Sequence, residues 1–212
     1  MKAVLSRSWR KLFSTDCCPL CATPFAQNAP VCTACMELLP WALDYSERAG
    51  LQVLSAFDYL PPINHLLLGG KSAHHLDQLN ILARLLAEHL PTVIRTKPQA
   101  ILPIPLHPRR LRQRGFNQSI ELTRPLAKAM QLPLITQAVI RQRHTPEQKL
   151  LSAVERLHNM QDAFLIRHHL PYQQIALFDD MITTGSTCLE LAKLLEAAGI
   201  SVQIWTCARA KR

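Results

Sequence analysis

The chain has 212 residues, of which 48% are hydrophobic and 18% are charged, and this composition excludes an intrinsically disordered protein. No apolar run is long enough to span a bilayer and the N-terminus lacks the long apolar core of a signal peptide, so we expect a cytoplasmic protein. A net charge of +9 favours polyanionic partners, either phosphorylated metabolites or nucleic acid.

The first 15 residues predict a basic amphipathic segment. Its apolar side chains fall on one helical face and cations surround them: Leu5, Trp9, Leu12 and Phe13 against Lys2, Arg7, Arg10 and Lys11. Such a segment either packs against the next module, the reading we favour, or attaches peripherally to an anionic membrane surface.

Residues 16–45 predict a zinc ribbon. Two Cys-x2-Cys pairs are separated by ten residues, a spacing typical of one tetrahedral zinc ion held by four thiolates: Cys18, Cys21, Cys32 and Cys35. Four protein ligands leave no open coordination position, so the zinc would be structural. Cys17 is an alternative to Cys18, although Cys18 gives the better spacing. Cys188 and Cys207 are expected to be buried, inert thiols.

The middle of the chain predicts alternating strands and helices. Residues 51–59 favour a strand or hairpin, 64–68 a short helical turn, and 77–90 an amphipathic helix capped by Asp77. Lys71 lies in the loop before this helix, where contact with a phosphate and a solvated side chain are both open.

A second buried strand is predicted over residues 100–104, and a cluster of arginines follows it. The cluster holds four fixed cations within six positions: Arg109, Arg110, Arg112 and Arg114. Because guanidinium groups bind phosphate oxygens in bidentate fashion, this cluster favours pyrophosphate. The next helix, 117–130, contains Pro125, which should kink or break it.

Residues 143–163 form a mixed-charge segment between two apolar pieces and resemble a mobile lid, with Arg143 and Arg156 as its candidate cations.

The most informative segment joins a buried strand, 175–178, to Asp179 and Asp180, and then to a hydroxyl-rich loop, 183–187. Leucines at helical spacing follow, so the loop is also a helix N-terminus, where free N–H groups and the helix dipole favour an anion. Two carboxylates beside an anion site require a ligand that also offers hydroxyls or a divalent cation. A ribose 5-phosphate meets both demands.

This segment resembles the 5-phosphoribosyl-1-pyrophosphate (PRPP) motif of type I phosphoribosyltransferases. The resemblance implies that Asp179 and Asp180 bind the ribose hydroxyls, that Mg²⁺ bridges pyrophosphate and ribose oxygens, and that the loop binds the 5-phosphate. The loop residues are Thr183, Thr184, Gly185, Ser186 and Thr187. It also implies that the lid closes over the pyrophosphate and excludes water.

Taken together, the cysteine module, the Pro-Ile-Pro strand with its Arg-Gly-Phe-Asn-Gln ending, the Arg-x-Thr-Pro-x-Gln segment and the PRPP motif resemble the ComF/GntX family from Cys18 to Arg209. That resemblance implies an α/β, type I phosphoribosyltransferase-like fold with a mainly parallel sheet over 46–212, after the zinc ribbon. It also implies a role in natural transformation, handling incoming single-stranded DNA near the uptake machinery of the inner membrane.

Three functions follow as hypotheses. The first is a ComF-like factor that binds PRPP with Mg²⁺ and single-stranded DNA, with the zinc module among the candidate DNA surfaces. The second is an active phosphoribosyltransferase acting on an unidentified nitrogen acceptor, in which Asp179, Asp180 and Arg143 would be catalytic and Arg109 and Arg110 would stabilise charge. The third is a zinc-ribbon regulator with a degenerate transferase domain.

Overall fold

The computed structural model describes residues 17–25, 29–72, 75–142 and 163–210. The chain separates into two compact units, Met1–Leu39 and Pro40–Arg212. The predicted amphipathic segment 1–15 and residues 143–162 of the predicted lid, which include Arg143 and Arg156, lie outside the described residues. The first unit contains one short helix, α1 (Thr33–Leu38), among its described residues.

The second unit is built on a five-stranded sheet with the order β1-β2-β7-β6-β3. Its strands are β1 (Trp41–Arg48), β2 (Leu51–Asp58), β3 (Ala100–Pro103), β6 (Gln174–Ile182) and β7 (Ser201–Arg209). Only β1 is antiparallel to its neighbour; β2, β7, β6 and β3 run parallel. The predicted α/β class with a mainly parallel sheet is confirmed.

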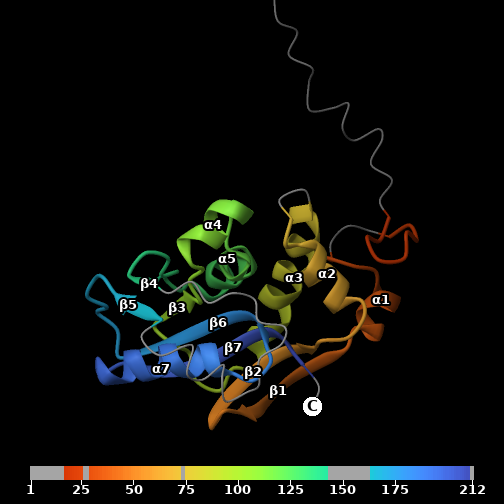
Figure 1. Ribbon diagram of the computed structural model, residues 1–212. Helices are drawn as coiled ribbons and strands as arrows, with labels where there is room; N and C mark the ends of the chain where they lie inside the picture. The colour runs from red at the N-terminus through yellow and green to blue at the C-terminus, as the bar shows by residue number, and fades with distance from the viewer. Residues whose placement is uncertain (1–16, 26–28, 73–74, 143–162, 211–212) are drawn as a thin grey trace, which may run out of the picture. The chain divides into compact units, whose positions relative to one another are not determined.

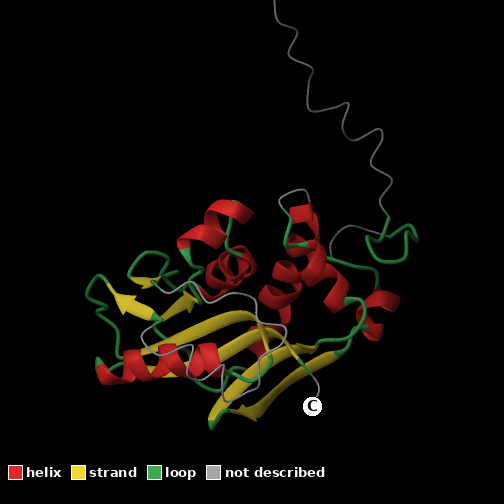
Figure 2. Ribbon diagram, in the orientation of Figure 1, coloured by secondary structure: helices red, strands yellow, loops and turns green. Residues whose placement is uncertain are grey.

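Helices cover both faces of this sheet, as Figures 1 and 2 show. The helices α2 (Ile63–Gly69), α3 (Leu76–His89) and α5 (Gln118–Met130) lie on one face, and α7 (Ser186–Ala197) lies on the other. A 3-10 turn, Leu90–Val93, follows α3, and α4 (Pro108–Arg114) precedes α5. A separate antiparallel pair consists of β4 (Val139–Arg141) and β5 (Phe164–Ile166).

Strand β6 shows why the sheet is buried on both sides. Ile175 and Leu177 pack in one apolar core with Leu191 of α7, and the alternate residues Ala176 and Phe178 are also fully buried. A continuous apolar run is what a parallel strand covered on both faces requires.

Three expectations need correction. The predicted boundary at 45/46 falls inside β1, because Trp41–Arg48 pairs with β2 as a hairpin. Asp77 is not the cap of α3: His75 occupies that position without a side-chain bond, and Asp77 lies in the first turn, where its charge favours the helix dipole. Of the kink or break expected at Pro125, the break does not occur: helix α5 runs through this residue, and Leu122 and Leu126 beside it are buried.

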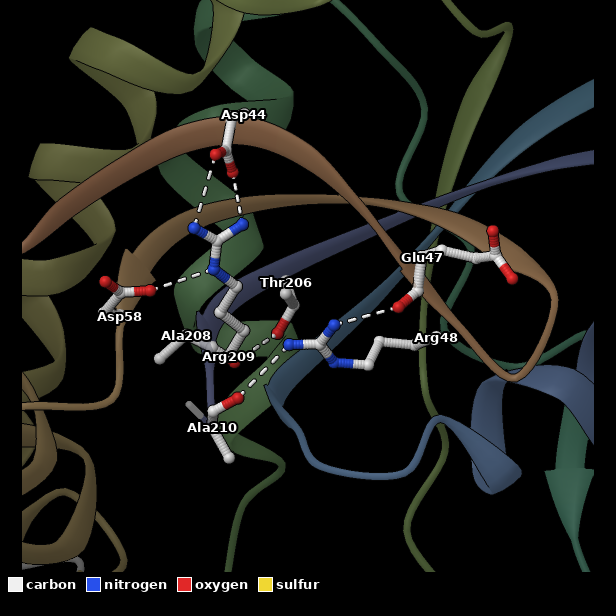
Figure 3. A network of polar contacts seen from close by, with 8 residues as sticks. All are labelled: Asp44, Glu47, Arg48, Asp58, Thr206, Ala208, Arg209 and Ala210. Atoms are coloured by element: carbon white, nitrogen blue, oxygen red, sulfur yellow. Dashed lines mark hydrogen bonds and ion pairs between the residues drawn. The ribbon is translucent and has the colours of Figure 1, made fainter. Parts of the chain in front are cut away.

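The C-terminal strand is tied to the β1–β2 hairpin by ion pairs, which Figure 3 shows. Arg209 donates from Nε to Asp58 at 2.9 Å, and its two terminal nitrogens reach the carboxylate of Asp44. Burial acts to lower the pKa of Arg209, but the hydrogen bonds to Asp58 and Asp44 outweigh it and raise that pKa.

Truncating the two acids separately should give unequal losses of stability. Asp58→Ala removes the largely buried partner and should lower the free energy of unfolding by about 1.5–3 kcal/mol. Asp44→Ala removes a carboxylate that is 55% exposed and should cost under about 1 kcal/mol. Urea unfolding measures both; an equal cost at the two positions would contradict this ranking.

Candidate functional site

The carboxylates of Asp179 and Asp180 lie on β6 beyond the point where its pairing with β3 ends. Pairing between β3 and β6 stops at Pro103 and Phe178, whereas β6 continues beside β7 to Ile182. Asp179 and Asp180 are therefore part of β6 itself, not residues that follow it. Beyond Pro103 the chain turns away towards α4, and this departure opens a cavity in front of the two acids.

The cavity has a volume of about 180 Å³. Charged side chains from four separate segments line it. They are Lys71, Arg110, Arg114, Arg141, Asp179 and Asp180. Thr187, in the first turn of α7, and Asn117, Gln118 and Ser119, at the start of α5, complete its polar wall. Four cations against two acids make this lining suitable for a polyanion that also carries hydroxyl groups.

A buried glutamine fixes the position of one cation. Gln118 is 1% exposed, donates from Nε2 to the carbonyl of Leu67 at 3.0 Å, and accepts from Arg114 at 2.9 Å. Asn117 beside it donates to the carbonyl of Ile104 and accepts from the N–H of Ser119, so it caps α5. The start of α5 thus holds α2, α4 and the end of β3 around the cavity.

Arg141 is the charged residue that the sequence analysis missed. It ends β4, lines the cavity, and its guanidinium lies 5.7 Å from the ring centre of Phe164. Burial, with the nearby charge of Arg110, lowers the pKa of Arg141, while the charge of Asp179 opposes that change. The charges of Arg110 and Asp179, which are distant in sequence, therefore act on Arg141 within one site. The arginine at the end of the short apolar run 139–141 was the available signal.

The predicted phosphate loop lies between β6 and α7. Gly185 has φ +83° and is the N-cap of α7, a left-handed conformation that favours glycine. A Cβ atom at this position would lie 3.2 Å from Cβ of Arg48, at the turn of the β1–β2 hairpin. Thr184 and Ser186 share a hydroxyl contact of 3.2 Å. Of the five predicted loop residues, only Thr187 lines the cavity.

The hairpin also supports this loop through Arg48, which is 9% exposed. Its guanidinium donates to the carbonyls of Glu47 and Ala210, as Figure 3 shows. The N–H of Ala210 in turn donates to the carbonyl of Ile182. Arg48 is thereby connected through Ala210 to Ile182, the last residue of β6, and it also lies beside Gly185 of the loop.

Not every predicted arginine reaches the cavity. Arg110 and Arg114 line it, but Arg109 and Arg112 are exposed and do not.

The pKa of Asp179 is raised well above the ordinary value for an aspartate. Burial is the main cause, and the charge of Asp180 adds to it, whereas Arg141 acts in the opposite direction. A bound cation, or a ligand that donates hydroxyl hydrogens, would relieve this repulsion between neighbouring carboxylates.

Asp179→Asn should therefore stabilise the ligand-free protein more at neutral than at acidic pH. The native carboxyl binds its proton more tightly than the unfolded one, so wild type loses stability as pH rises from about 4 through the raised pKa. Urea unfolding at pH 4.5 and 7.5 should show a larger gain for the variant at pH 7.5. Asp77→Asn, in the first turn of α3, is the matched control; an identical gain for Asp179→Asn at both pH values would contradict the prediction.

Four cysteines of the first unit form a candidate metal centre. The sulfur atoms of Cys18, Cys21, Cys32 and Cys35 all lie within 4.8 Å of one another, and those of Cys21 and Cys32 are 3.6 Å apart. Tetrahedral thiolates at about 2.3 Å from zinc lie about 3.8 Å from each other, so the group fits the metal. Cys18, not Cys17, belongs to this cluster.

Local hydrogen bonds favour the thiolate form of Cys21. The side chain and backbone of Thr23 lower the pKa of Cys21 to about 6. Cys188 and Cys207 are buried instead, and burial with the nearby aspartates raises the pKa of both well above its ordinary value. They are the inert thiols that the sequence predicts.

The purified protein should contain one zinc ion per chain. Cys18→Ser should lose the metal, whereas Cys17→Ser should retain it, because only Cys18 contributes to the sulfur cluster. Elemental analysis with a chelator-displacement assay measures the stoichiometry. Retention of zinc by Cys18→Ser together with its loss from Cys17→Ser would reverse the ligand assignment.

Comparison with known proteins was made for sequence and for structure. No protein-family model matches the chain. Competence protein F of Haemophilus influenzae is 32% identical over 209 residues, covering 95% of this chain and 88% of that protein. The chain belongs to the ComF family. DNA utilization protein YhgH is 32% identical in Escherichia coli K12 and 34% in Salmonella typhimurium, covering 91% and 98% of this chain and 83% and 89% of those proteins.

Among solved structures, adenine phosphoribosyltransferase from Leishmania tarentolae has a TM-score of 0.45 at 15% identity, over 79% of this chain and 95% of that one. The Leishmania donovani enzyme gives 0.45 at 12% identity, over 78% and 86%. Separately, no helix in the described part of this ComF-family chain combines the length and apolar character needed to cross a membrane.

Proposed function

We propose that this ComF-family protein binds PRPP with Mg²⁺ in the cavity in front of β6 and serves in DNA uptake, where it handles single-stranded DNA. The observation that carries the proposal is the meeting of Asp179 and Asp180 with Arg110, Arg114, Lys71 and Arg141 in one cavity beside the first turn of α7. The names of the relatives, competence protein F and DNA utilization protein, support the biological role.

The cavity and the neighbouring loop 183–187 each offer groups that match a part of the ligand. The two carboxylates would accept hydrogen bonds from ribose hydroxyls and hold Mg²⁺, which prefers oxygen ligands. The backbone N–H groups and hydroxyls at residues 183–187 would bind the 5-phosphate at a helix N-terminus. The arginines and Lys71 would neutralise the pyrophosphate, and Mg²⁺ would supply further charge stabilisation there.

The rival proposal is that the same site transfers the phosphoribosyl group to a nitrogen acceptor. The placement of cations beside the paired acids favours it, because departing pyrophosphate needs charge stabilisation at that position. Pyrophosphate release in the presence of PRPP, Mg²⁺ and a panel of bases separates a transferase from a binding protein. A degenerate domain would bind no PRPP at all.

Calorimetry should detect PRPP binding that depends on Mg²⁺. Asp180→Asn should weaken it about tenfold or more, because a hydrogen bond to a charged group is lost. Gly185→Ala should weaken it as well, because the added Cβ meets Arg48 and displaces the loop.

Gly50→Ala is the matched control for the loop variant. Gly50 also has positive φ, at +77°, but its added Cβ would meet nothing within 4 Å, so it bears the backbone strain alone. Absence of Mg²⁺-dependent heat in wild type would refute the site assignment, and equal weakening by the two alanines would refute the role given to the loop.

A further inference from the structure

Helix α4 distributes its arginines over two environments. Arg110 and Arg114, one turn apart, line the cavity of the acids, while Arg109 and Arg112 are exposed on a different part of the helix surface. Helix α4 has seven residues, of which four are arginines and none is acidic. Two of these arginines therefore face the cavity and two face solvent.

The two exposed arginines have no acidic partner among the residues that the structure describes. Within residues 17–25, 29–72, 75–142 and 163–210, no carboxylate forms an ion pair with Arg109 or Arg112, whereas Arg124 on the neighbouring helix α5 pairs with Glu121 at 3.3 Å. An uncompensated pair of guanidinium groups is suited to successive phosphates, which accept forked hydrogen bonds.

A second cavity, of about 150 Å³, lies against the same helix. Aliphatic side chains and prolines make up most of its described lining. Among them are Pro105, Pro108, Leu111, Ile120, Val139 and Ile140. It shares Leu106, Asn117 and Arg141 with the first cavity, so the two are adjacent. Leu111 lines this cavity, is 42% exposed, and lies between Arg109 and Arg112 in the sequence of α4.

We propose that this surface of α4 binds single-stranded DNA, with backbone phosphates on Arg109 and Arg112 and one unstacked base in the cavity beside Leu111. The proposal rests on the proposed function and adds the surface that contacts the strand. Each nucleotide of a nucleic acid carries a phosphate and a base with an apolar face. The exposed guanidinium groups of Arg109 and Arg112 would bind the phosphates, and the adjacent apolar cavity would accept the base. The strand must be single, because a duplex keeps its base faces stacked.

The phosphate contacts are tested by the salt dependence of binding. Fluorescence anisotropy with labelled oligothymidylate gives the slope of log affinity against log salt for wild type and for Arg109→Gln/Arg112→Gln. Two lost contacts should reduce the magnitude of this slope by about 1.4. The control, Arg84→Gln/Lys128→Gln, removes the same charge from exposed positions on α3 and α5 and should leave the slope near wild type.

The possible results distinguish failure of the α4 assignment from failure of the DNA-handling proposal itself. If wild type shows no salt-dependent binding of the oligonucleotide, the DNA-handling proposal fails and this inference fails with it. If wild type binds and the two double variants change the slope equally, only the assignment to α4 is overturned. Unchanged PRPP heat in every variant verifies that the fold and the first cavity are intact.

The base contact is tested by a second oligonucleotide that carries abasic sites at the same length and charge. Leu111→Ala should weaken binding of oligothymidylate several-fold while leaving the abasic strand and the salt slope unchanged, since alanine removes only apolar contact. An equal loss for both strands, or no loss for either, overturns the role of the cavity.

Discussion

The structure of the site depends on the fact that β3 is shorter than its neighbour β6. Strand β3 ends its pairing at Pro103, whereas β6 continues to Ile182 with β7 on its other side. Had β3 continued, its side chains would fill the space in front of Asp179 and Asp180. Instead, the chain leaves the sheet through Ile104 and Pro105 and returns as α4, which brings arginines to the opening. The acids, the cations and the cavity all follow from this early ending.

Charge balance explains why such a site is stable without its ligand. Burial raises the pKa of Asp179 well above its ordinary value, and repulsion from the adjacent carboxylate of Asp180 adds to this increase. Arg141 offsets part of it from β4, and the bond from Arg114 to Gln118 holds a second cation near the acids without neutralising them. The cavity therefore presents charge of both signs, which a ligand carrying hydroxyls and phosphates can contact at once.

Sequence patterns foresaw the features that depend on neighbouring residues and missed those that depend on distant ones. The run Ile175 to Phe178, the Cys-x2-Cys spacing and the helical spacing of leucines after the loop 183–187 are local signals, and each agrees with the structure. The hairpin strand β1 was missed because its residues are only partly buried and carry a mixed pattern. Arg141 was missed because its role comes from the pairing of β4 with β5. The separation of Arg109 from Arg110 depends on helix orientation, which spacing alone does not fix.

The strand order also fixes when the site can form. Strand β7 lies between β2 and β6 although it comes last in sequence among the described strands, and the bond from Arg48 to Ala210 joins residues 162 positions apart. Contacts between residues this far apart form late in folding, because the conformational entropy of the intervening loop is lost before the sheet contacts stabilise the structure. During synthesis, neither the phosphate loop nor its support from the hairpin can be complete until residue 210 has left the ribosome. Before that point the chain would hold the acids of β6 but not the framework that positions them, so anion binding should begin only after residue 210 has emerged.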